Sequence, residues 1–410
     1  MLGLSGKEDW TLKSPNKTIA VVGGAGHVGA PLALLLAQQG FSVVIHDINR
    51  KSMDQMMRGY MPFHEEGGES LLRAVLRTGR LEFSTRPESI QGARAVILTV
   101  GTPIDEFHNP VTSLVTRCLD LLLPHLDSKA LLILRSTVAP GTTEFLHRHL
   151  EKKGKVPKLA FCPERVVQGK AIQEIRTLPQ IVSGTSASAV RAAGEIFSRI
   201  AKKIVLMTPR EAEYAKLICN AYRYIQFAAT NQLYMMVESA GLDYHRLLDG
   251  MKKGYPRMAG IPRAGFAAGP CLMKDTMQLF AFEKHNFVLG QVAMTINEGL
   301  PDFLVSRLGQ TCDLTRETVG ILGMAFKADS DDIRDSLSFK LQKILRFAGA
   351  HVLCSDPFVD NDSFVTPREI LSDCRIVILG VPHRAYRSLK IPRQTVLVDP
   401  WGFFPARRSI

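Results

Sequence analysis

The sequence lacks an uninterrupted apolar segment long enough to cross a membrane. The nearest candidate, Ile19 to Ala37, is interrupted by glycines, His27 and Pro31, whereas a membrane-spanning helix needs about 20 predominantly apolar residues. This segment is typical of a strand, a glycine-rich turn and a helix. Residues 1–16 have no apolar signal core. We therefore expect an N-terminal extension over residues 1–16 and no membrane partner.

Cysteine is scarce and scattered. The seven cysteines are odd in number and include no CxxC pair. This pattern argues against a disulfide framework and against a structural zinc site, and it is typical of a reducing compartment. We expect a cytoplasmic protein that binds no metal.

Long basic runs are also missing, although the formal net charge is +12, with 51 basic and 39 acidic residues. The basic residues are dispersed and are not interleaved with aromatic residues, which argues against nucleic-acid binding. A positive charge of this kind still favours anionic partners. Dinucleotides and nucleotide sugars are small anions that fit.

The pattern of apolar residues predicts an α/β protein with a helical middle. Strand-like runs such as Thr18–Val22 and Phe41–Ile45 alternate with helical stretches, which is typical of a parallel sheet covered on both faces. A second set of strand-like runs opens at Thr318–Leu322. Between them, Glu211 to about Ala240 has neither Pro nor Gly and predicts a helix of about 30 residues. Its apolar residues lie all round the helix, which indicates burial, for example in a subunit interface.

A chain of 410 residues is too long for one compact core. We therefore expect two Rossmann-like, doubly wound domains joined by a central helical domain with a long helix. The expected boundaries are 1–16 for the extension, 17–208 for the first Rossmann domain, 209–305 for the helical domain and 306–410 for the second Rossmann-like domain.

A glycine-rich turn follows the first expected strand. Gly24, Gly26 and Gly29 form a GxGxxG pattern that opens a helix, as in dinucleotide-binding folds, where the turn lets a pyrophosphate approach the backbone. Asp47 stands at the end of the second strand, where a carboxylate accepts hydrogen bonds from a ribose and repels a 2′-phosphate. NAD is therefore favoured over NADP, although Arg50 and Lys51 stand nearby.

Two further segments are hard to explain by packing alone. Arg135–Thr143 is rich in hydroxyl groups and follows a strand, where α/β sheets place ligands. Lys216 and Asn220 are spaced i, i+4 on the expected long helix, so that their side chains share one side. Such residues usually lie on a surface, but the neighbouring positions here are apolar.

Cys271 stands in the segment Gly265–Thr276, directly after Pro270. Proline is favoured early in a helix, so we expect Cys271 in a first helical turn, where the helix dipole favours a thiolate. Asp275 then falls one turn later on the same side. A lone cysteine is more often an inert small hydrophobe, but the glycine-flanked, polar setting favours a nucleophile.

The ordered segments resemble those of the UDP-glucose/GDP-mannose dehydrogenase family, from about Lys17 to the C-terminus. The matching segments are GAGHVG (24–29), TVGTP (99–103), RSTVAPGTT (135–143), CPERVVQG (162–169), EAEYAKLICN (211–220), GPCLMKD (269–275) and GMAFKADSDDIRDS (323–336). The resemblance implies an NAD-dependent nucleotide-sugar 6-dehydrogenase that oxidises a CH₂OH group to a carboxylate with two NAD⁺.

The resemblance also implies the roles of individual residues. Cys271 would attack the aldehyde that the first oxidation produces, and water would release the uronic acid from a thioester. Lys216, Asn220 and Asp275 would hold a water and stabilise the oxyanion, while Thr137 and Glu164 would assist through water and thioester hydrolysis.

Further residues are implied in binding the two ligands. The cofactor would be bound by Gly24, Gly26, His27, Val28, Gly29, Asp47, Thr102, Thr137 and Arg334. The substrate would be bound by Glu164, Arg165, Lys216, Asn220, Arg257, Gly265, Lys274, Phe326 and Lys327. Arg257 resembles an arginine that the family contributes to the neighbouring subunit's sugar site, which implies a homodimer built on the central helix.

The identity of the sugar stays open between two branches of the family. CPERV, with Gln168 in place of a second carboxylate, resembles the branch that oxidises UDP-N-acetylmannosamine or UDP-N-acetylglucosamine, whereas Lys274–Asp275 looks more like the UDP-glucose branch. We slightly favour an N-acetylated hexosamine. A β-hydroxyacid dehydrogenase would need neither Cys271 nor a second α/β domain. A non-catalytic nucleotide-sugar binding protein would be expected to have lost Cys271 or Lys216.

Overall fold

The computed structural model describes residues 18–105, 111, 113–155, 157–284 and 286–405. The chain divides into two compact units, unit 1 from Met1 to Cys219 and unit 2 from Asn220 to Ile410. The expected extension over residues 1–16 lies outside the described residues. Within the described ranges, no helix is long and apolar enough to cross a membrane.

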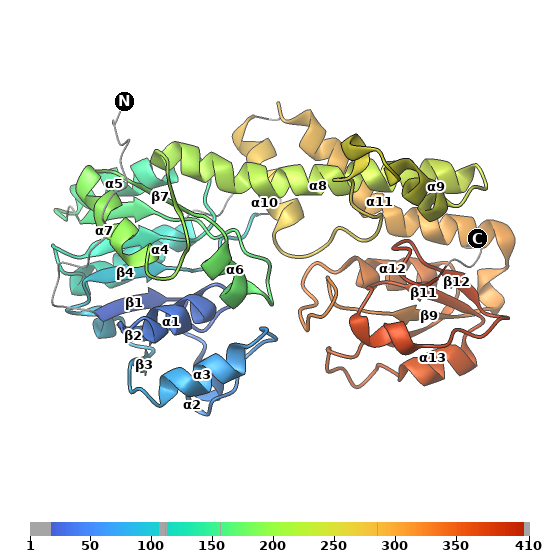
Figure 1. Ribbon diagram of the computed structural model, residues 1–410, viewed down its shortest axis with the longest axis horizontal. Coiled ribbons are helices and arrows are strands. Elements are labelled where there is room, and N and C mark those ends of the chain that lie inside the picture. The colour runs from blue at the N-terminus through green and yellow to red at the C-terminus, as the bar shows by residue number, and fades with distance from the viewer. Residues whose placement is uncertain (1–17, 106–110, 112, 156, 285, 406–410) are drawn as a thin grey trace. The chain divides into compact units, whose positions relative to one another are not determined.

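Unit 1 is built on an eight-stranded sheet with the order β3-β2-β1-β4-β5-β6-β7-β8 (Figure 1). The strands are β1 (Thr18–Val22), β2 (Ser42–His46), β3 (Leu81–Ser84), β4 (Ala95–Leu98), β5 (Leu131–Leu134), β6 (Lys158–Phe161), β7 (Gln180–Gly184) and β8 (Ile204–Leu206). Neighbouring strands are parallel except β6 and β7. The strand order changes direction between β1 and β4, and in such sheets this is the point where a ligand binds.

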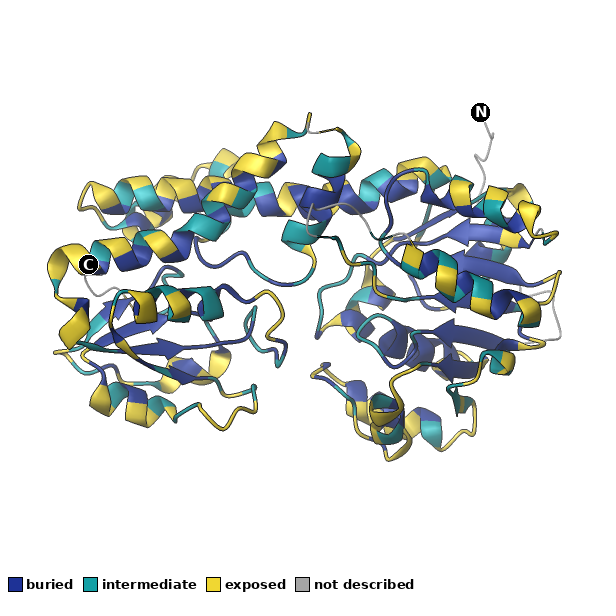
Figure 2. Ribbon diagram, turned by 180° about the vertical axis from the view of Figure 1, so that it is seen from behind, coloured by how far each residue is buried: buried dark blue, intermediate teal, exposed yellow. Residues whose placement is uncertain are grey.

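Helices cover both faces of this sheet. They are α1 (Gly29–Gln38), α2 (Arg50–Met57), α3 (Gly68–Leu76), α4 (Ser113–Leu122), α5 (Thr142–Lys152), α6 (Ala171–Thr177) and α7 (Ala187–Phe197). Successive side chains of β1 point to opposite faces. Ile19 and Val21 therefore join one apolar core with α1, α3, α6 and α7, whereas Ala20 and Val22 join another with α4 and α5. Figure 2 shows the strands as almost continuously buried ribbons.

The expected long helix is α8 (Pro209–Ser239), which has 31 residues, begins in unit 1 and ends in unit 2. Burial is confined to part of its circumference. Tyr224, Ala228 and Asn231 are buried, whereas Tyr222 and Met236 are 61% and 59% exposed. The single chain therefore leaves apolar side chains of α8 uncovered.

Unit 2 contains a parallel four-stranded sheet with the order β10-β9-β11-β12. The strands are β9 (Thr318–Leu322), β10 (His351–Ser355), β11 (Ile376–Leu379) and β12 (Val396–Val398), and the helices are α9 (Tyr244–Lys252), α10 (Leu272–Phe282), α11 (Val288–Thr311), α12 (Leu337–Phe347) and α13 (Pro367–Asp373). One apolar core packs α11 and α12 on the sheet, and a second packs α13 on the opposite face (Figure 1). The expected fold, two Rossmann-like doubly wound parts joined by a helical region, is confirmed.

Unit 2 also contains a buried network of amide groups. The Asn231 amide pairs with the Gly265 peptide, accepting from Gly265 N at 2.9 Å and donating to Gly265 O at 3.0 Å. It also donates to Asn297 Oδ1 at 2.9 Å, and Asn297 donates to Tyr224 O at 3.1 Å. On its other side, Gly265 has a φ of 141°, and a Cβ there would lie 2.3 Å from the Trp401 ring. Glycine is therefore required at 265. The contacts of Gly265 with Asn231 and Trp401 fix the start of the segment that leads to Cys271.

Replacement of Asn231 by Leu tests the contribution of the Asn231–Gly265 hydrogen bonds to stability. The variant leaves the Gly265 peptide and the Asn297 amide buried without their partner, so the free energy of unfolding should fall by about 2–4 kcal/mol, measured by urea unfolding. The matched control is Thr230→Val at the next, equally buried position, because the structure records no hydrogen-bond partner for the Thr230 hydroxyl among the described residues. The control should change the free energy by less than about 0.5 kcal/mol, and equal losses in both variants would contradict the role of Asn231.

Candidate active site

The turn after β1 is closed by backbone contacts that only glycine permits. Gly23 has a φ of 77°, and Gly23 N donates to His46 O at 2.8 Å. A Cβ on Gly24 would lie 2.7 Å from Val21 O, and one on Gly29 would lie 2.3 Å from Gly23 O. At Gly26 the nearest atom would be 3.4 Å away, so packing inside the chain does not require glycine there. An approaching pyrophosphate does, and this fits the turn to a dinucleotide.

Asp47 holds the same turn from the end of β2. Its carboxylate accepts hydrogen bonds from Ala25 N and Asn49 N, both at 2.9 Å, and the residue remains partly exposed. Asn49 caps α2, and Ile48 beside it is 91% exposed. The turn thus presents a partly exposed carboxylate that can accept hydrogen bonds from a ribose.

Other residues predicted to bind the cofactor lie around this turn. Val28 is the N-cap residue of α1, and the His27 ring stacks on Phe63 with 4.1 Å between centroids. Thr102 donates to Thr137 O at 2.5 Å, which ties the loop after β4 to the loop after β5. Thr99, which the sequence pattern did not single out, also holds this turn: its hydroxyl donates to Val22 O at 2.7 Å and to Gly23 O at 3.1 Å. A hydroxyl residue directly after the β4 strand pattern was the available signal.

Most of the hydroxyl-rich segment 135–143 supports the structure of unit 1. Glu213 on α8 accepts hydrogen bonds from Gly141 N at 2.5 Å, Thr143 N at 2.7 Å and Thr143 Oγ1 at 2.6 Å, and it thereby satisfies the first turn of α5. Burial raises the pKa of Glu213, and these hydrogen bonds oppose the rise. Thr137, the residue of this segment with a predicted catalytic role, stays partly exposed.

Glu164 is engaged by a buried cation that the sequence analysis did not single out. Its carboxylate is ion-paired with Arg135 and accepts from Arg165 N at 2.7 Å and Val166 N at 3.0 Å. Arg135 also donates to Cys162 O at 3.1 Å and to Gln180 Oε1 at 3.0 Å. A fully buried guanidinium needs a counter-ion. Glu164 therefore has a structural role beside any catalytic one, and Arg165 is placed next to it, with its guanidinium bound to Pro179 O.

Unit 2 contains the nucleophile candidate. Cys271 is exposed and is the N-cap residue of α10, one position before the first helical residue. A helix N-terminus stabilises a thiolate. Cys271 O accepts from Asp275 N at 2.8 Å, so that Asp275 lies one turn along.

The structure brings two predicted catalytic residues together beside this cysteine. The buried Asp275 carboxylate accepts from Asn220 Nδ2 at 2.6 Å and pairs with Lys274 Nζ at 2.7 Å. Lys216 lies one turn before Asn220 on α8, in the last residues of unit 1, and is also buried. An amide and a cation around a buried carboxylate form a site that can orient a water and move a proton.

The loop between β9 and α12 packs against the segment that contains Cys271. Gly269 N donates to Asp335 O at 3.2 Å, and a Cβ on Gly269 would lie 2.3 Å from the Phe326 ring. Lys327 Nζ lies 6.0 Å from the centroid of that same ring. The pKa of Arg334 is raised, first by its hydrogen bonds to Asp332 and further by nearby charges that include Cys271. Phe326, Lys327 and Arg334 thus lie on one loop that borders the cysteine.

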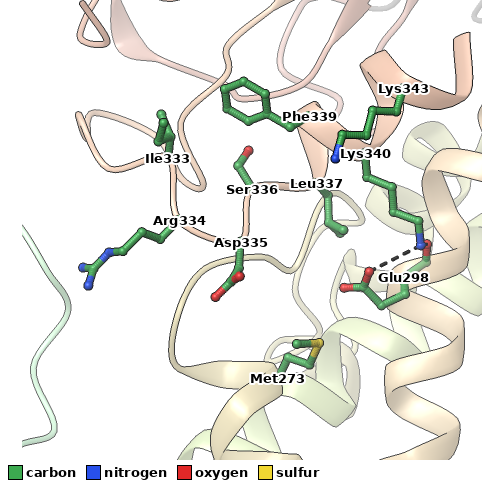
Figure 3. Close-up of a pocket in the computed structure, with 10 residues that line it drawn as sticks. All are labelled: Met273, Glu298, Ile333, Arg334, Asp335, Ser336, Leu337, Phe339, Lys340 and Lys343. Atoms are coloured by element: carbon green, nitrogen blue, oxygen red, sulfur yellow. Dashed lines mark hydrogen bonds and ion pairs between the residues drawn. The ribbon is translucent and has the colours of Figure 1, made fainter. Parts of the chain in front are cut away.

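A cavity of about 600 Å³ is lined in part by this loop. It lies between the loop, α10, α11 and α12, and its lining includes Met273, Glu298, Arg334, Asp335 and Lys340. Figure 3 shows Lys340 paired with Glu298, at 3.3 Å, and Arg334 pointing away from that pair. Charges of both signs therefore line the cavity.

Two predicted substrate residues lie outside these contacts. Arg257 is exposed on a short 3₁₀ helix (Pro256–Met258), with its guanidinium 5.7 Å from the Tyr255 ring centroid. Gly265 is hydrogen-bonded to the Asn231 amide and packs against the Trp401 ring. In the part of the chain that the structure describes, no disulfide joins the seven cysteines, and no cluster of three or more His, Cys, Asp or Glu side chains could hold a metal ion.

A dinucleotide turn in one unit, with an exposed thiol beside a buried carboxylate and amide in the other, defines a nicotinamide-dependent oxidoreductase. Comparison with known proteins makes this class more specific. Models of the UDP-glucose/GDP-mannose dehydrogenase family match residues 17–203 as its NAD binding domain, 210–298 as its central domain and 320–408 as its UDP binding domain. The chain belongs to this family, and it is an NAD-dependent dehydrogenase of nucleotide sugars.

Individual relatives match nearly the whole chain. A UDP-N-acetyl-D-mannosamine dehydrogenase of Pyrococcus horikoshii is 28% identical over 93% of this chain and 94% of its own. A solved structure of UDP-D-ManNAc dehydrogenase from the same organism is 27% identical and has a TM-score of 0.88, covering 95% of this chain and 96% of that chain. A UDP-glucose dehydrogenase structure from Pyrobaculum islandicum is 25% identical with a TM-score of 0.84 and the same coverage.

The position of Asp47 predicts a change in cofactor preference on mutation. Replacement of Asp47 by Ala removes the acceptor for the ribose hydroxyls and the repulsion of a 2′-phosphate. The KM for NAD⁺ should rise roughly ten-fold or more, and the ratio of kcat/KM for NADP⁺ to that for NAD⁺ should increase. Initial rates with each cofactor measure both values. Asp54→Ala on α2 removes the same charge nearby and should leave the ratio unchanged; an unchanged ratio in the Asp47 variant would refute the assignment.

Proposed function

We propose that this chain oxidises the C6 hydroxymethyl group of a UDP-sugar to a carboxylate, with Cys271 as the covalent nucleophile. The observation that supports this proposal is the exposed Cys271 thiol at the start of α10, with Asp275 one turn along and Asn220 bound to it. A β-hydroxyacid dehydrogenase needs no such thiol. A four-electron oxidation can use one, because a thiohemiacetal holds the aldehyde on the protein until its second oxidation.

The reaction balances with two molecules of NAD⁺ and one water. In the first step the alcohol loses a hydride and a proton and becomes an aldehyde. The Cys271 thiolate then forms a C–S bond to the aldehyde carbon, and the resulting thiohemiacetal loses a second hydride to give a thioester. Water breaks the C–S bond and releases the carboxylate, which restores the thiol. The overall products are one uronate, two NADH and three protons.

The remaining catalytic residues have supporting roles in this proposal. Lys216 and Asn220 share one side of α8, and Asn220 connects that side to Asp275. A protonated lysine near the alkoxide or the thiohemiacetal oxygen stabilises its developing negative charge, and Asp275 with Asn220 orients the hydrolytic water. Thr137 and Glu164 assist from the loops after β5 and β6.

The same proposal assigns the ligand contacts in each unit. The β1 turn, with Gly26 and Asp47, binds the pyrophosphate and ribose of NAD, and His27 and Thr102 belong to the same site. Arg334 is assigned to the cofactor by the family resemblance alone. The nucleotide sugar is bound in this proposal by Glu164, Arg165, Lys216, Asn220, Gly265, Lys274, Phe326 and Lys327. The Phe326–Gly269 contact supports this grouping, because it joins the nucleotide loop to the cysteine segment.

We favour an N-acetylated hexosamine as the sugar and, within that branch, UDP-N-acetylmannosamine over UDP-N-acetylglucosamine. Gln168 stands where the UDP-glucose branch usually has a carboxylate, and the Pyrococcus horikoshii relative is named for UDP-N-acetyl-D-mannosamine. UDP-glucose is the runner-up, because Lys274–Asp275 resembles that branch and the Pyrobaculum islandicum enzyme shares the fold.

A panel of substrates tests the proposed function. Purified chain with NAD⁺ should oxidise one of UDP-N-acetylmannosamine, UDP-N-acetylglucosamine, UDP-glucose and GDP-mannose, with the highest kcat/KM for the first. NADH absorbance measures the rate, and mass spectrometry identifies the uronate. A higher kcat/KM for UDP-glucose would overturn the sugar assignment alone. If none of the four nucleotide sugars is oxidised, the proposed function is wrong.

We further propose a homodimer through the central helices. Tyr222 and Met236 on α8 and Val288 and Leu289 on α11 leave large apolar side chains exposed, and such patches mark protein interfaces. A second copy would cover them and bring its exposed Arg257 to the neighbouring sugar site. Light scattering at micromolar concentration should give twice the chain mass of 45.3 kDa, and a monomer mass would contradict the dimer.

A further inference from the structure

The turn after β9 in unit 2 repeats the turn after β1 in unit 1, although its sequence has no GxGxxG. Each opens with a glycine of positive φ, Gly23 at 77° and Gly323 at 95°. Each ends against an aspartate that follows the neighbouring strand. Three hydrogen bonds of each turn match. In unit 1, Gly23 N donates to His46 O at 2.8 Å, and the Asp47 carboxylate accepts from Ala25 N and Asn49 N, both at 2.9 Å. In unit 2, Gly323 N donates to Ser355 O at 2.8 Å, and the Asp356 carboxylate accepts from Ala325 N at 2.9 Å and Phe358 N at 2.8 Å.

The registers of the two sheets extend this correspondence to a third strand. Leu98 of β4 pairs with Val22, and Leu379 of β11 pairs with Leu322. Four residues beyond these strand ends stand Thr102 in unit 1 and His383 in unit 2. His383 therefore corresponds to Thr102 in its number of residues past the end of the third strand.

The two positions differ in what they do to the aspartate. In unit 1, Thr102 donates to Thr137 O, and Asp47 stays partly exposed. In unit 2, His383 Nε2 lies 3.0 Å from Asp356 Oδ2, and the side chains of both residues are 0% exposed. The second turn is thus closed by an imidazole, so that Asp356 has no face left for a ribose.

The other nitrogen of the imidazole anchors the nucleotide loop. Asp329 N lies 2.9 Å from His383 Nδ1. A backbone N–H only donates, so Nδ1 accepts, and Nε2 carries the hydrogen that is donated to Asp356. Asp329 has a φ of 53° and is also held by Arg384, whose N and Nε donate to its carboxylate at 3.0 and 2.6 Å. Burial alone would raise the pKa of Asp329, but the hydrogen bonds from Arg384 outweigh it and lower the pKa.

The anchored segment leads directly to the site. Asp329 lies between Phe326 and Asp335, the two residues of this loop that contact Gly269 two positions before Cys271. A left-handed aspartate is costly for the backbone and persists because His383 and Arg384 hold it. Release of Asp329 would therefore loosen the loop that contains Phe326 and Lys327.

We propose that His383 is a positioning residue for the nucleotide sugar: its imidazole fills the ribose position of a second, closed dinucleotide turn and fastens the loop 326–336 through Asp329. The inference rests on the proposed function, in which this loop binds the nucleotide of the substrate. We therefore expect His383 variants to bind the nucleotide sugar more weakly, while kcat and the KM for NAD⁺ stay close to the wild-type values.

Three substitutions separate the two hydrogen bonds of the imidazole. His383→Asn places an amide oxygen near Nδ1 and keeps the acceptor for Asp329 N. His383→Gln places an amide nitrogen near Nε2 and keeps the donor to Asp356, and His383→Ala removes both. The KM for the UDP-sugar should rise roughly ten-fold or more in the Ala and Gln variants and less in the Asn variant, with kcat and the KM for NAD⁺ within about two-fold of wild type. Added imidazole should lower the KM of the Ala variant.

Tyr386→Phe is the matched control, because the Tyr386 ring lies edge-on to His383 and its hydroxyl donates to Ser355 O at 3.1 Å without contacting Asp329. It removes one buried hydrogen bond from the same place and should leave the KM unchanged. Wild-type KM values in all three His383 variants, or an equal rise in Tyr386→Phe, would overturn the role of His383 alone. A wild-type chain that neither binds nor oxidises any UDP-sugar would overturn the proposed function as well. If the Ala variant does not fold, the KM values of the Asn and Gln variants test the proposal: a KM for the UDP-sugar that rises less in Asn than in Gln supports it, and equal values contradict it.

Discussion

The hydrogen bond between Asn220 and the buried Asp275 is the interaction on which the proposed role of Cys271 depends. It joins α8 to α10 within unit 2, and Asp275 N also bonds to Cys271 O. The start of α10, and with it the thiol, is therefore fixed relative to the long helix. A buried carboxylate persists only with such partners. The same polar contacts that stabilise this carboxylate place it one helical turn after Cys271.

Local patterns could be predicted from the sequence, and long-range pairs could not. The GxGxxG turn with Asp47 depends on a fixed spacing within one βαβ unit, and the strand from Thr318 to Leu322 depends on a short run of β-formers. The bounds of α8 were also predicted closely, but its exposed face was not, because apolarity all round a helix does not show which side the same chain covers. Arg135 pairs with Glu164 across two strands, and no local spacing indicates that contact. The expected division into three domains stays a prediction beside the two compact units of the structure.

The repeated turn in unit 2 could not be predicted from a local sequence pattern either. GMAF at 323–326 has a single glycine, so a search for a glycine-rich pattern passes over it. What the two turns share is the strand geometry and an aspartate that accepts backbone N–H groups. Their difference is a side chain far along the chain, His383, which closes one turn while the other stays open to a ribose. One strand–turn–aspartate geometry thus forms a partly exposed turn in unit 1 and, in unit 2, a closed turn whose histidine bonds to the loop 326–336.

The covalent role of Cys271 can be tested by counting the NADH molecules that Cys271→Ser forms per sugar. With the preferred UDP-sugar as limiting reagent, the wild-type chain should form two NADH and one uronate per sugar. The serine variant should stop after the first oxidation, with no more than one NADH per sugar and no uronate, because a serine hydroxyl is a poor nucleophile without an adjacent base. Two NADH and a full yield of uronate from the serine variant would contradict the account.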